Sequence, residues 1–316
     1  EHAPEDERLD ILHVDNANPS IIAENLEPAS EITRTLISTL SDGAVLSFGL
    51  ESADPLVHQE NWLNCNAEQL KIAIRHINEF GREPGQRGLP KLLPGLNFIA
   101  GLNGETEESY QMNLQLLRVL RSEGLWLRRI NIRQVEGLGF QEIPQDTFQE
   151  FKNSVREEID KPLLKEMFPI GTELKGVWWE AHDDRIRRPE QVLQKIHRDA
   201  SIYGSSGITF GRQIGAYPIL VGTPYQIPLE TKSDIIVTGH GMRSISGVES
   251  GLSINTATQS QLEAIPGIGS KAAWRIVSNR AKASRNSKGP IFSDVEEALT
   301  QVGVQSYGLA SKVLKV

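Results

Sequence analysis

The chain has 316 residues and a formal net charge of −8, and 39% of its residues are hydrophobic, which is enough for a sizeable core and two or three domains. Its one cysteine excludes a disulfide framework and a cysteine-rich zinc site. No apolar run approaches the roughly 18 residues that a membrane-spanning helix needs, so we expect a cytoplasmic protein with no membrane partner.

The charge is unevenly distributed along the chain. Residues 1–150 carry 24 acidic and 12 basic side chains, residues 151–250 carry 13 of each, and residues 251–316 carry 4 acidic and 8 basic. Binding to a polyanion is therefore expected of the C-terminal segment rather than of the rest of the chain.

Four successive strand–helix units are predicted in the N-terminal half. The expected strands are Asp10–Asp15, a run that begins at Ala44, a run that begins at Leu93, and Leu127–Gln134. Helical spacing of apolar residues predicts helices at Glu31–Leu40, Ala67–Phe80 and Glu107–Arg121. Strands that alternate with helices imply an α/β fold with parallel pairing.

Alternate positions on these strands are largely polar or glycine. They are Ile11, His13 and Asp15; Ser47, Gly49 and Glu51; Asn97, Ile99 and Gly101; and Arg129, Asn131 and Arg133. In a closed or partly closed barrel, such residues face a cavity at the C-terminal ends of the strands. The alternative is a doubly wound, flavodoxin-like sheet, whose strands are usually apolar on both faces. We favour the barrel.

Several segments resemble radical S-adenosylmethionine (SAM) enzymes. FGLESADPLVHQENWLN at 48–64 and NFIAGLNGETEES at 97–109 are similar to the fourth and fifth strand segments of that family. LHVDNANP at 12–19 and RRINIRQVE at 128–136 resemble the third and sixth. The whole chain is most similar to uncharacterised archaeal-type radical SAM proteins that end in a helix-hairpin-helix domain. Residues 1–148 would then form strands three to six of a partial (β/α) barrel.

The resemblance implies SAM as the cofactor and assigns roles to individual residues. Glu51 stands at the GxES position, on a strand that contacts the ribose or methionine part, and Asn97 and Gly101 lie on the strand that faces adenine. The implied cofactor-binding residues are Asp15, Ser47, Glu51, Asn97 and Gly101, and the implied catalytic residues are Glu51, Arg129 and Arg133. Either arginine would clamp a carboxylate in bidentate fashion. Internal ion pairs, capping by Glu51 and turn formation at Asp15 are the alternatives.

The departure from the family lies in the cysteines. Radical SAM chemistry requires a [4Fe–4S] cluster held by a CxxxCxxC loop, and this chain offers only Cys65, for which we expect no special role. Because the chain starts at Glu1 and joins the pattern at strand three, we interpret it as a fragment whose cluster ligands lie elsewhere. The complete enzyme would cleave SAM to a 5′-deoxyadenosyl radical. The alternative is a non-catalytic nucleic-acid-binding or assembly protein with a degenerate barrel.

The middle of the chain predicts a helical connection followed by a small β-barrel. A charged helix is expected at Gln149–Met167, within a connection at 149–168. Short β runs separated by Gly and Pro predict a small β-rich domain at 169–250, interrupted by a helix-like stretch at Arg188–Arg198. This domain resembles a TRAM-type, RNA-associated barrel. Phe210, Arg212 and Tyr217 would either stack on bases or fill the core and rim of the barrel.

The tail at 251–316 carries a helix-hairpin-helix pattern. Its hairpin is Ile265-Pro266-Gly267-Ile268-Gly269, and Asn255 and Thr256 are expected to cap the first helix. The motif resembles a sequence-independent binder of DNA or RNA backbones, with Gly267, Gly269, Ser270, Lys271 and Arg275 around a phosphate. A weaker second copy has Phe292–Val295 at a helix start and Val302-Gly303-Val304 in the hairpin. The alternative is a packing module that binds no nucleic acid.

Overall fold

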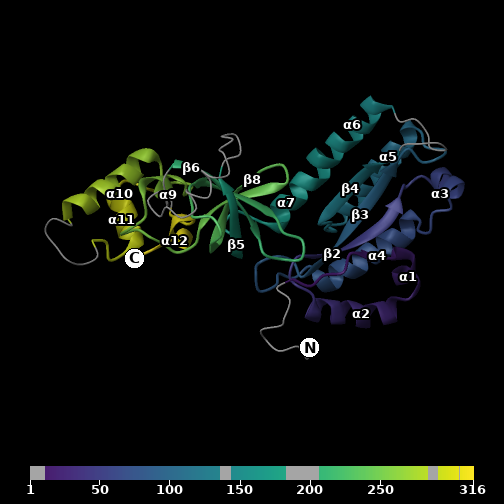
Figure 1. The fold of residues 1–316 in the computed structure, drawn as a ribbon, viewed down its shortest axis with the longest axis horizontal. Helices are drawn as coiled ribbons and strands as arrows, with labels where there is room; N and C mark the ends of the chain where they lie inside the picture. Colours follow the sequence, from purple (N-terminus) through teal and green to yellow (C-terminus); the bar gives the residue numbers. More distant parts are fainter. Residues whose placement is uncertain (1–10, 136–143, 183–205, 284–290, 306) are drawn as a thin grey trace. The chain divides into compact units, whose positions relative to one another are not determined.

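The computed structural model describes residues 11–135, 144–182, 206–283, 291–305 and 307–316 (Figure 1). The chain divides into two compact units: Glu1–Met167 with Gly215–Tyr217, and Phe168–Ile214 with Pro218–Val316. The helix-like stretch expected at Arg188–Arg198 lies outside the described residues.

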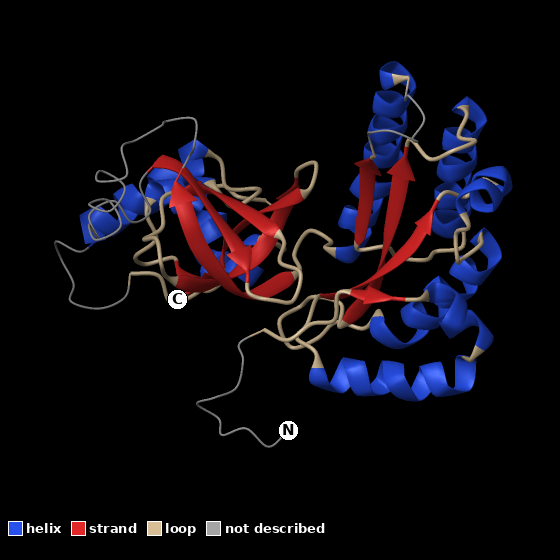
Figure 2. Cartoon of the chain, turned by 45° about the vertical axis from the view of Figure 1, so that its right-hand side comes forward, coloured by secondary structure: helices blue, strands red, loops and turns tan. Residues whose placement is uncertain are grey.

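The first unit contains a four-stranded parallel sheet whose order follows the chain. Its strands are β1 (Asn16–Ala17), β2 (Ala44–Glu51), β3 (Leu92–Ala100) and β4 (Arg129–Gln134). The helices are α1 (Pro19–Glu24), α2 (Leu26–Thr39), α3 (Pro55–Asn61), α4 (Ala67–Gly81), α5 (Glu107–Ser122), α6 (Gln145–Ser154) and α7 (Lys161–Met167), with a π-helical turn at Val155–Asp160 between the last two. They gather on one side of the sheet (Figure 2). A doubly wound sheet would have helices on both faces, so the flavodoxin-like alternative does not describe this part of the chain.

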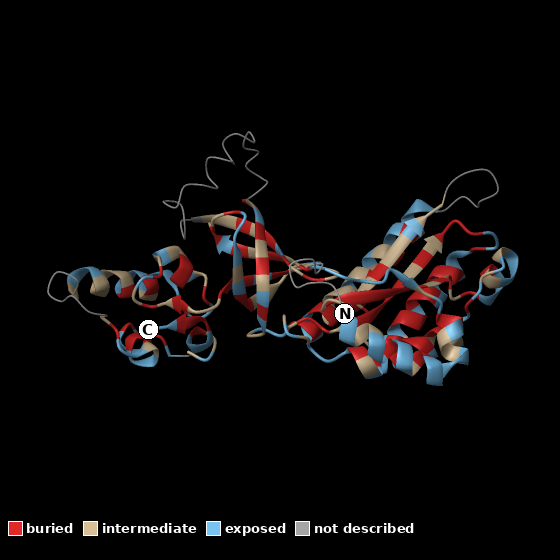
Figure 3. Cartoon of the chain, turned by 60° about the horizontal axis from the view of Figure 1, so that its bottom comes forward, coloured by how far each residue is buried: buried red, intermediate tan, exposed pale blue. Residues whose placement is uncertain are grey.

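The hydrophobic core of this unit lies between the sheet and the helices that cover one of its faces. Phe48 and Leu50 of β2 are fully buried, as are Ile74 and Ile77 of α4, and Figure 3 colours much of β2 and β3 as buried. Asn66 begins α4 with a capping box, which fixes the start of that helix. The alternation predicted from the sequence therefore separates an apolar, helix-covered face from a polar face.

The first strand differs from its prediction. The sequence predicts Asp10–Asp15, whereas the sheet pairing joins only Asn16 to Ser47 and Ala17 to Phe48. Asp15 contributes only its carbonyl oxygen, which accepts a 2.9 Å hydrogen bond from the Ser47 N–H. In the described part of the sheet β1 has one neighbouring strand, β2. The side chains of residues 11–15 therefore have no second strand to pack beside, and they are exposed.

The second unit begins with a closed five-stranded barrel, which confirms the predicted small β-barrel. Its strands are β5 (Glu173–His182), β6 (Ser206–Gln213), β7 (Leu220–Tyr225), β8 (Lys232–His240) and β9 (Ser244–Glu249), in the order β5-β6-β7-β9-β8. Strands β7 and β9 are parallel and the other paired strands are antiparallel. A five-stranded barrel with this order and a parallel third–fifth pair has OB-fold topology. Trp179 and Tyr225 are fully buried inside it.

The predicted helix-hairpin-helix follows the barrel, and a second pair of short helices lies where the weaker copy was predicted. The helix-hairpin-helix consists of α9 (Gln259–Glu263) and α10 (Ser270–Ala283), and the second pair consists of α11 (Val295–Gln301) and α12 (Ala310–Val313). Short parallel strands β10 (Leu252–Ser253) and β11 (Leu314–Lys315) join the two ends of this domain. None of the described helices is both long and apolar enough to cross a lipid bilayer.

Candidate functional site

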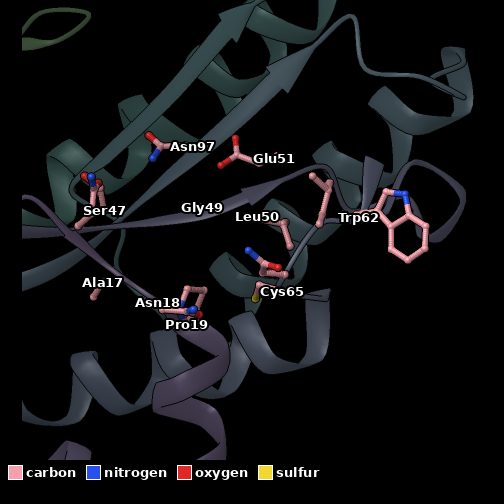
Figure 4. Close-up of a pocket in the computed structure, with 13 residues that line it drawn as sticks. Ala17, Asn18, Pro19, Ser47, Gly49, Leu50, Glu51, Trp62, Cys65 and Asn97 are labelled. Carbon is pink, nitrogen blue, oxygen red and sulfur yellow. The ribbon is translucent and has the colours of Figure 1, made fainter. Parts of the chain in front are cut away.

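A polar pocket of about 480 Å³ lies on the polar side of the parallel sheet, toward the carboxyl ends of its strands (Figure 4). Four segments line it: β1 with the turn into α1, strand β2, strand β3, and the connection between α3 and α4. The lining residues are Asn16, Ala17, Asn18, Pro19, Ser47, Gly49, Leu50, Glu51, Trp62, Leu63, Asn64, Cys65 and Asn97. Its position is where enzymes built on parallel strands place their ligands.

Glu51 is held above this pocket by an irregular end of β2. The register with β3 shifts between Gly49 and Glu51, and Glu51 has a left-handed backbone with a φ of 67°. The side chain folds back over Gly49, because a Cβ atom added there would lie 2.6 Å from Glu51 Oε1. Glycine at position 49 therefore leaves the space that the carboxylate occupies.

The carboxylate of Glu51 is poorly solvated and incompletely paired. Its Oε2 atom is buried and accepts no hydrogen bond from the residues that the structure describes. Burial raises the pKa of Glu51 above its ordinary value, and the positive charge of Arg133 opposes this shift. A ligand that donates hydrogen bonds to Oε2 would relieve this desolvation.

A chain of polar side chains crosses from β4 to the pocket. Arg129 Nε donates to Asn131 Oδ1 at 2.8 Å, and Asn131 Nδ2 donates to Asn97 Oδ1 at 2.7 Å. The Arg129 guanidinium also lies 4.7 Å from the ring centre of Tyr217, which belongs by its contacts to the first unit. Arg129 does not line the pocket, so the structure does not place it as the carboxylate clamp that the resemblance implies.

The structure brings together only part of the predicted cofactor-binding set. Ser47, Glu51 and Asn97 line the pocket, whereas Asp15 is exposed and Gly101 lies outside the lining. The Gly101 N–H donates to the Glu105 carboxylate at 2.6 Å, and its φ of 94° is the reason for glycine there. Arg133 is exposed, and its positive charge acts on the Glu51 carboxylate.

Sequence reasoning missed the α3–α4 connection. Trp62 ends α3 with a left-handed backbone, φ 53°, and its side chain is 90% exposed. The signal was present in Asp54 and Pro55, which form the N-cap and first residue of α3. Cys65, 2% exposed, has its pKa raised to about 11 by burial, so its thiol stays protonated at neutral pH. The described residues contain no group of three or more metal-ligating side chains, so a [4Fe–4S] cluster does not fit them.

The second candidate site is the hairpin before α10. Gly267 has a φ of 98°, which favours glycine. The side chains of Ile265 and Ile268 are buried and hold the hairpin against the core of the domain. Nothing lies within 4 Å of a Cβ atom added at Gly269, so the hairpin is open at the start of α10. Lys271 is exposed in the first turn of that helix, beside its free backbone N–H groups.

Two residues predicted around the hairpin have structural partners. Arg275 Nη1 donates to the Val302 carbonyl at 3.1 Å, which ties the first hairpin to the second, although its side chain remains exposed. The prediction that Asn255 caps α9 is wrong. Its side-chain amide instead forms hydrogen bonds with the backbone of Ile291 and Phe292.

The cap of α9 is Thr258, in a capping box with Gln261, so Thr256 is not the cap either. The helix begins at Gln259, further along the chain than the prediction placed it, and the cap moves with it.

The three residues that were predicted either to stack on bases or to fill the barrel contact other parts of the protein. The Phe210 ring covers Gly222, where an added Cβ would approach it to 3.4 Å, and Arg212 forms an ion pair with Glu180. Tyr217 contacts the guanidinium groups of Arg128 and Arg129.

Comparison with known proteins matches residues 248–294 to the helix-hairpin-helix motif family. An uncharacterized protein of Archaeoglobus fulgidus is 37% identical over 270 residues, which cover 82% of this chain and 47% of that protein. An uncharacterized protein of Methanocaldococcus jannaschii is 35% identical over 248 residues, which cover 75% of this chain and 42% of that protein. The chain thus spans less than half the length of each of these archaeal relatives.

Proposed function

We propose that the chain is part of a radical SAM enzyme and that the polar pocket binds the nucleoside part of SAM. The observation that carries the proposal is Glu51: a desolvated carboxylate with one unpaired oxygen, at the carboxyl end of a parallel strand. The sheet supports it, since consecutive parallel strands with helices on one side and polar residues on the other are what part of a (β/α) barrel requires.

The residues of the pocket divide the binding between them. Glu51 accepts hydrogen bonds from ribose hydroxyls, and Gly49 leaves room for its carboxylate. Asn97 donates from the neighbouring strand, and Ser47 adds a hydroxyl to the lining of the pocket. When bound and reductively cleaved, SAM supplies a radical that abstracts hydrogen from a substrate. The three thiolates for a cluster do not fit this chain and would come from a segment outside it.

The test uses the complete gene product, including any segment that precedes Glu1, reconstituted with iron and sulfide. We expect iron–sulfur absorbance, and formation of 5′-deoxyadenosine from SAM under reducing conditions. Because a hydrogen bond to a charged group contributes about 1.5–3 kcal/mol, Glu51→Gln should lower kcat/KM about 10- to 100-fold.

Glu230→Gln is the matched control, because Glu230 also has a left-handed backbone but is exposed in the second unit. A complete protein that binds neither cluster nor SAM would overturn the proposal and favour a degenerate barrel that serves as a scaffold.

We propose as a second activity that the helix-hairpin-helix domain binds the nucleic-acid backbone, which would place a nucleic-acid-linked substrate near the enzyme. The open hairpin at Gly269, the exposed Lys271 and the match to the motif family support this proposal. Trp274, 58% exposed, lies one turn along α10 from Lys271. Acidic Glu296 and Glu297 lie in the first turn of α11, so the basic surface of this domain is small and binding should be weak.

Fluorescence anisotropy of a labelled duplex, measured over a series of salt concentrations, tests this activity. Lys271→Gln should make the slope of log K against log salt shallower, by about the amount that one phosphate contact contributes. Lys282→Gln, at the other end of α10, is the matched control and should leave the slope unchanged. Equal slopes for both variants would refute a phosphate site at this hairpin.

A further inference from the structure

We propose that Arg129 and Asn131 form a positioning relay that fixes the Asn97 amide with its NH₂ group toward the pocket, so that the pocket selects a ligand carrying a vicinal diol. The inference rests on the proposed function, because it concerns the same pocket. It assigns Asn131 a role that its place in the sequence alone does not indicate, and it changes the role of Arg129 from clamp to support.

The polarity of the relay follows from the donors available. A guanidinium can only donate hydrogen bonds, so the Asn131 atom that faces Arg129 Nε, 2.8 Å away, must be its carbonyl oxygen. The other end of the Asn131 amide is then the NH₂ group, which donates to Asn97 at 2.7 Å. Asn97 must therefore accept through Oδ1, and its own NH₂ group is left for the pocket.

The pairing of the strands places this NH₂ group beside the Glu51 carboxylate. Asn131, Asn97 and Gly49 are opposite one another in register across β4, β3 and β2. The Glu51 carboxylate lies over Gly49, so it occupies the next place in the same row. Figure 4 shows the Asn97 nitrogen on the side of Ser47 and Gly49, with its oxygen turned away.

A donor beside an acceptor selects a ligand with the complementary pair. One hydroxyl of a ribose diol donates to Glu51, and the oxygen of the neighbouring hydroxyl accepts from the Asn97 NH₂ group. A ligand without one of these hydroxyls leaves a desolvated polar group unpaired, which sites built for hydrogen bonding reject strongly. The fixed Asn97 amide therefore favours ribonucleosides over their deoxy analogues.

The test is calorimetric titration of the chain with 5′-methylthioadenosine and with its 2′-deoxy and 3′-deoxy analogues. The wild type should prefer the full diol about 10-fold or more. Asn131→Asp should abolish this preference to within about 3-fold, because an aspartate accepts from both Arg129 and Asn97 and draws the Asn97 NH₂ group away from the pocket. Arg129→Met, which removes the donor that fixes the polarity, should weaken the preference less.

Asn153→Asp, on the exposed side of α6, is the matched control, since it adds the same charge away from the pocket. It should keep the wild-type preference, and circular dichroism should show that every variant is folded. If folded Asn131→Asp and Arg129→Met retain the full preference for the diol, the relay is overturned and the proposed function stands. If the wild type binds none of the three nucleosides, the proposed function itself fails and the inference with it.

Discussion

Replacing Glu51 by glutamine should make the chain more stable at neutral pH. In the folded state its carboxylate has a buried, unpaired oxygen and a pKa raised by desolvation, with Arg133 compensating only in part. Glutamine keeps the shape of the side chain and removes the charge. Because the carboxylate is costly only when ionised, the gain should depend on pH.

The size of the gain follows from the cost of leaving a buried polar group unpaired, about 1–3 kcal/mol. Glu51 is only partly buried, so solvent screens its charge and we expect the lower end, about 1 kcal/mol. A raised folded-state pKa means that the folded state holds the proton more tightly than the unfolded state. The stability that Glu51 contributes is present below the ordinary carboxyl pKa and is lost as the pH rises through the folded value.

The assay is urea unfolding of wild type and Glu51→Gln, at about pH 4 and about pH 7.5. The two proteins should be nearly equal in stability at the lower pH, and the variant should be more stable at the higher one. Glu230→Gln removes an exposed carboxylate from the same left-handed backbone region and should change stability by less than about 0.5 kcal/mol at either pH. A Glu51→Gln variant that is less stable than wild type at the higher pH would show that the carboxylate is well paired and would refute the reasoning.

Three further predictions concern other parts of the chain. Asn255→Ala should destabilise the second unit by about 2 kcal/mol in thermal unfolding, because it removes three backbone contacts, whereas Asn255→Asp keeps the acceptor and should cost less. Gly267→Ala should cost about 1–2 kcal/mol through its left-handed φ, and Gly269→Ala, with open space around it, should cost much less; equal effects would contradict this account. Cys65 should react with iodoacetamide about 100-fold more slowly in the folded chain than in urea at about pH 8, and equal rates would contradict its raised pKa.

The alternation of polar and apolar residues was enough to predict the faces of the sheet. Ser47 and Asn97 lie on the polar side as expected, and Phe48 and Phe98 are buried on the other. The bulge before Glu51 was not predictable in this way, because an extra residue in a strand leaves no trace in a period of two. An extra residue in the strand would by itself turn the Glu51 side chain to the other face of the sheet. The left-handed backbone at Glu51 turns it back, so that its carboxylate lies over Gly49.

Contacts between residues far apart in sequence account for what the sequence did not show at Asn255 and Arg129. Asn255 has the residue type of a helix cap, and the contacts that decide its role lie 36 and 37 positions further along the chain. Arg129 has the residue type of a carboxylate clamp, and its guanidinium lies 4.7 Å from the ring centre of Tyr217, which is far along the chain. Residue type limits what a side chain can do, and the tertiary partner decides which of these things it does.

The distribution of backbone strain gives a reason to place function at the pocket that is independent of any resemblance. Among the described residues, three that are not glycine have a positive φ: Glu51, Trp62 and Glu230. A left-handed backbone costs about 1–2 kcal/mol for such residues and persists only where the surroundings enforce it. Glu230 lies in an exposed turn, whereas Glu51 and Trp62, which come from different segments, both line the pocket. Folding alone gains nothing from a desolvated carboxylate and a 90% exposed indole held there at that cost, whereas a ligand that pairs with the carboxylate would recover part of it.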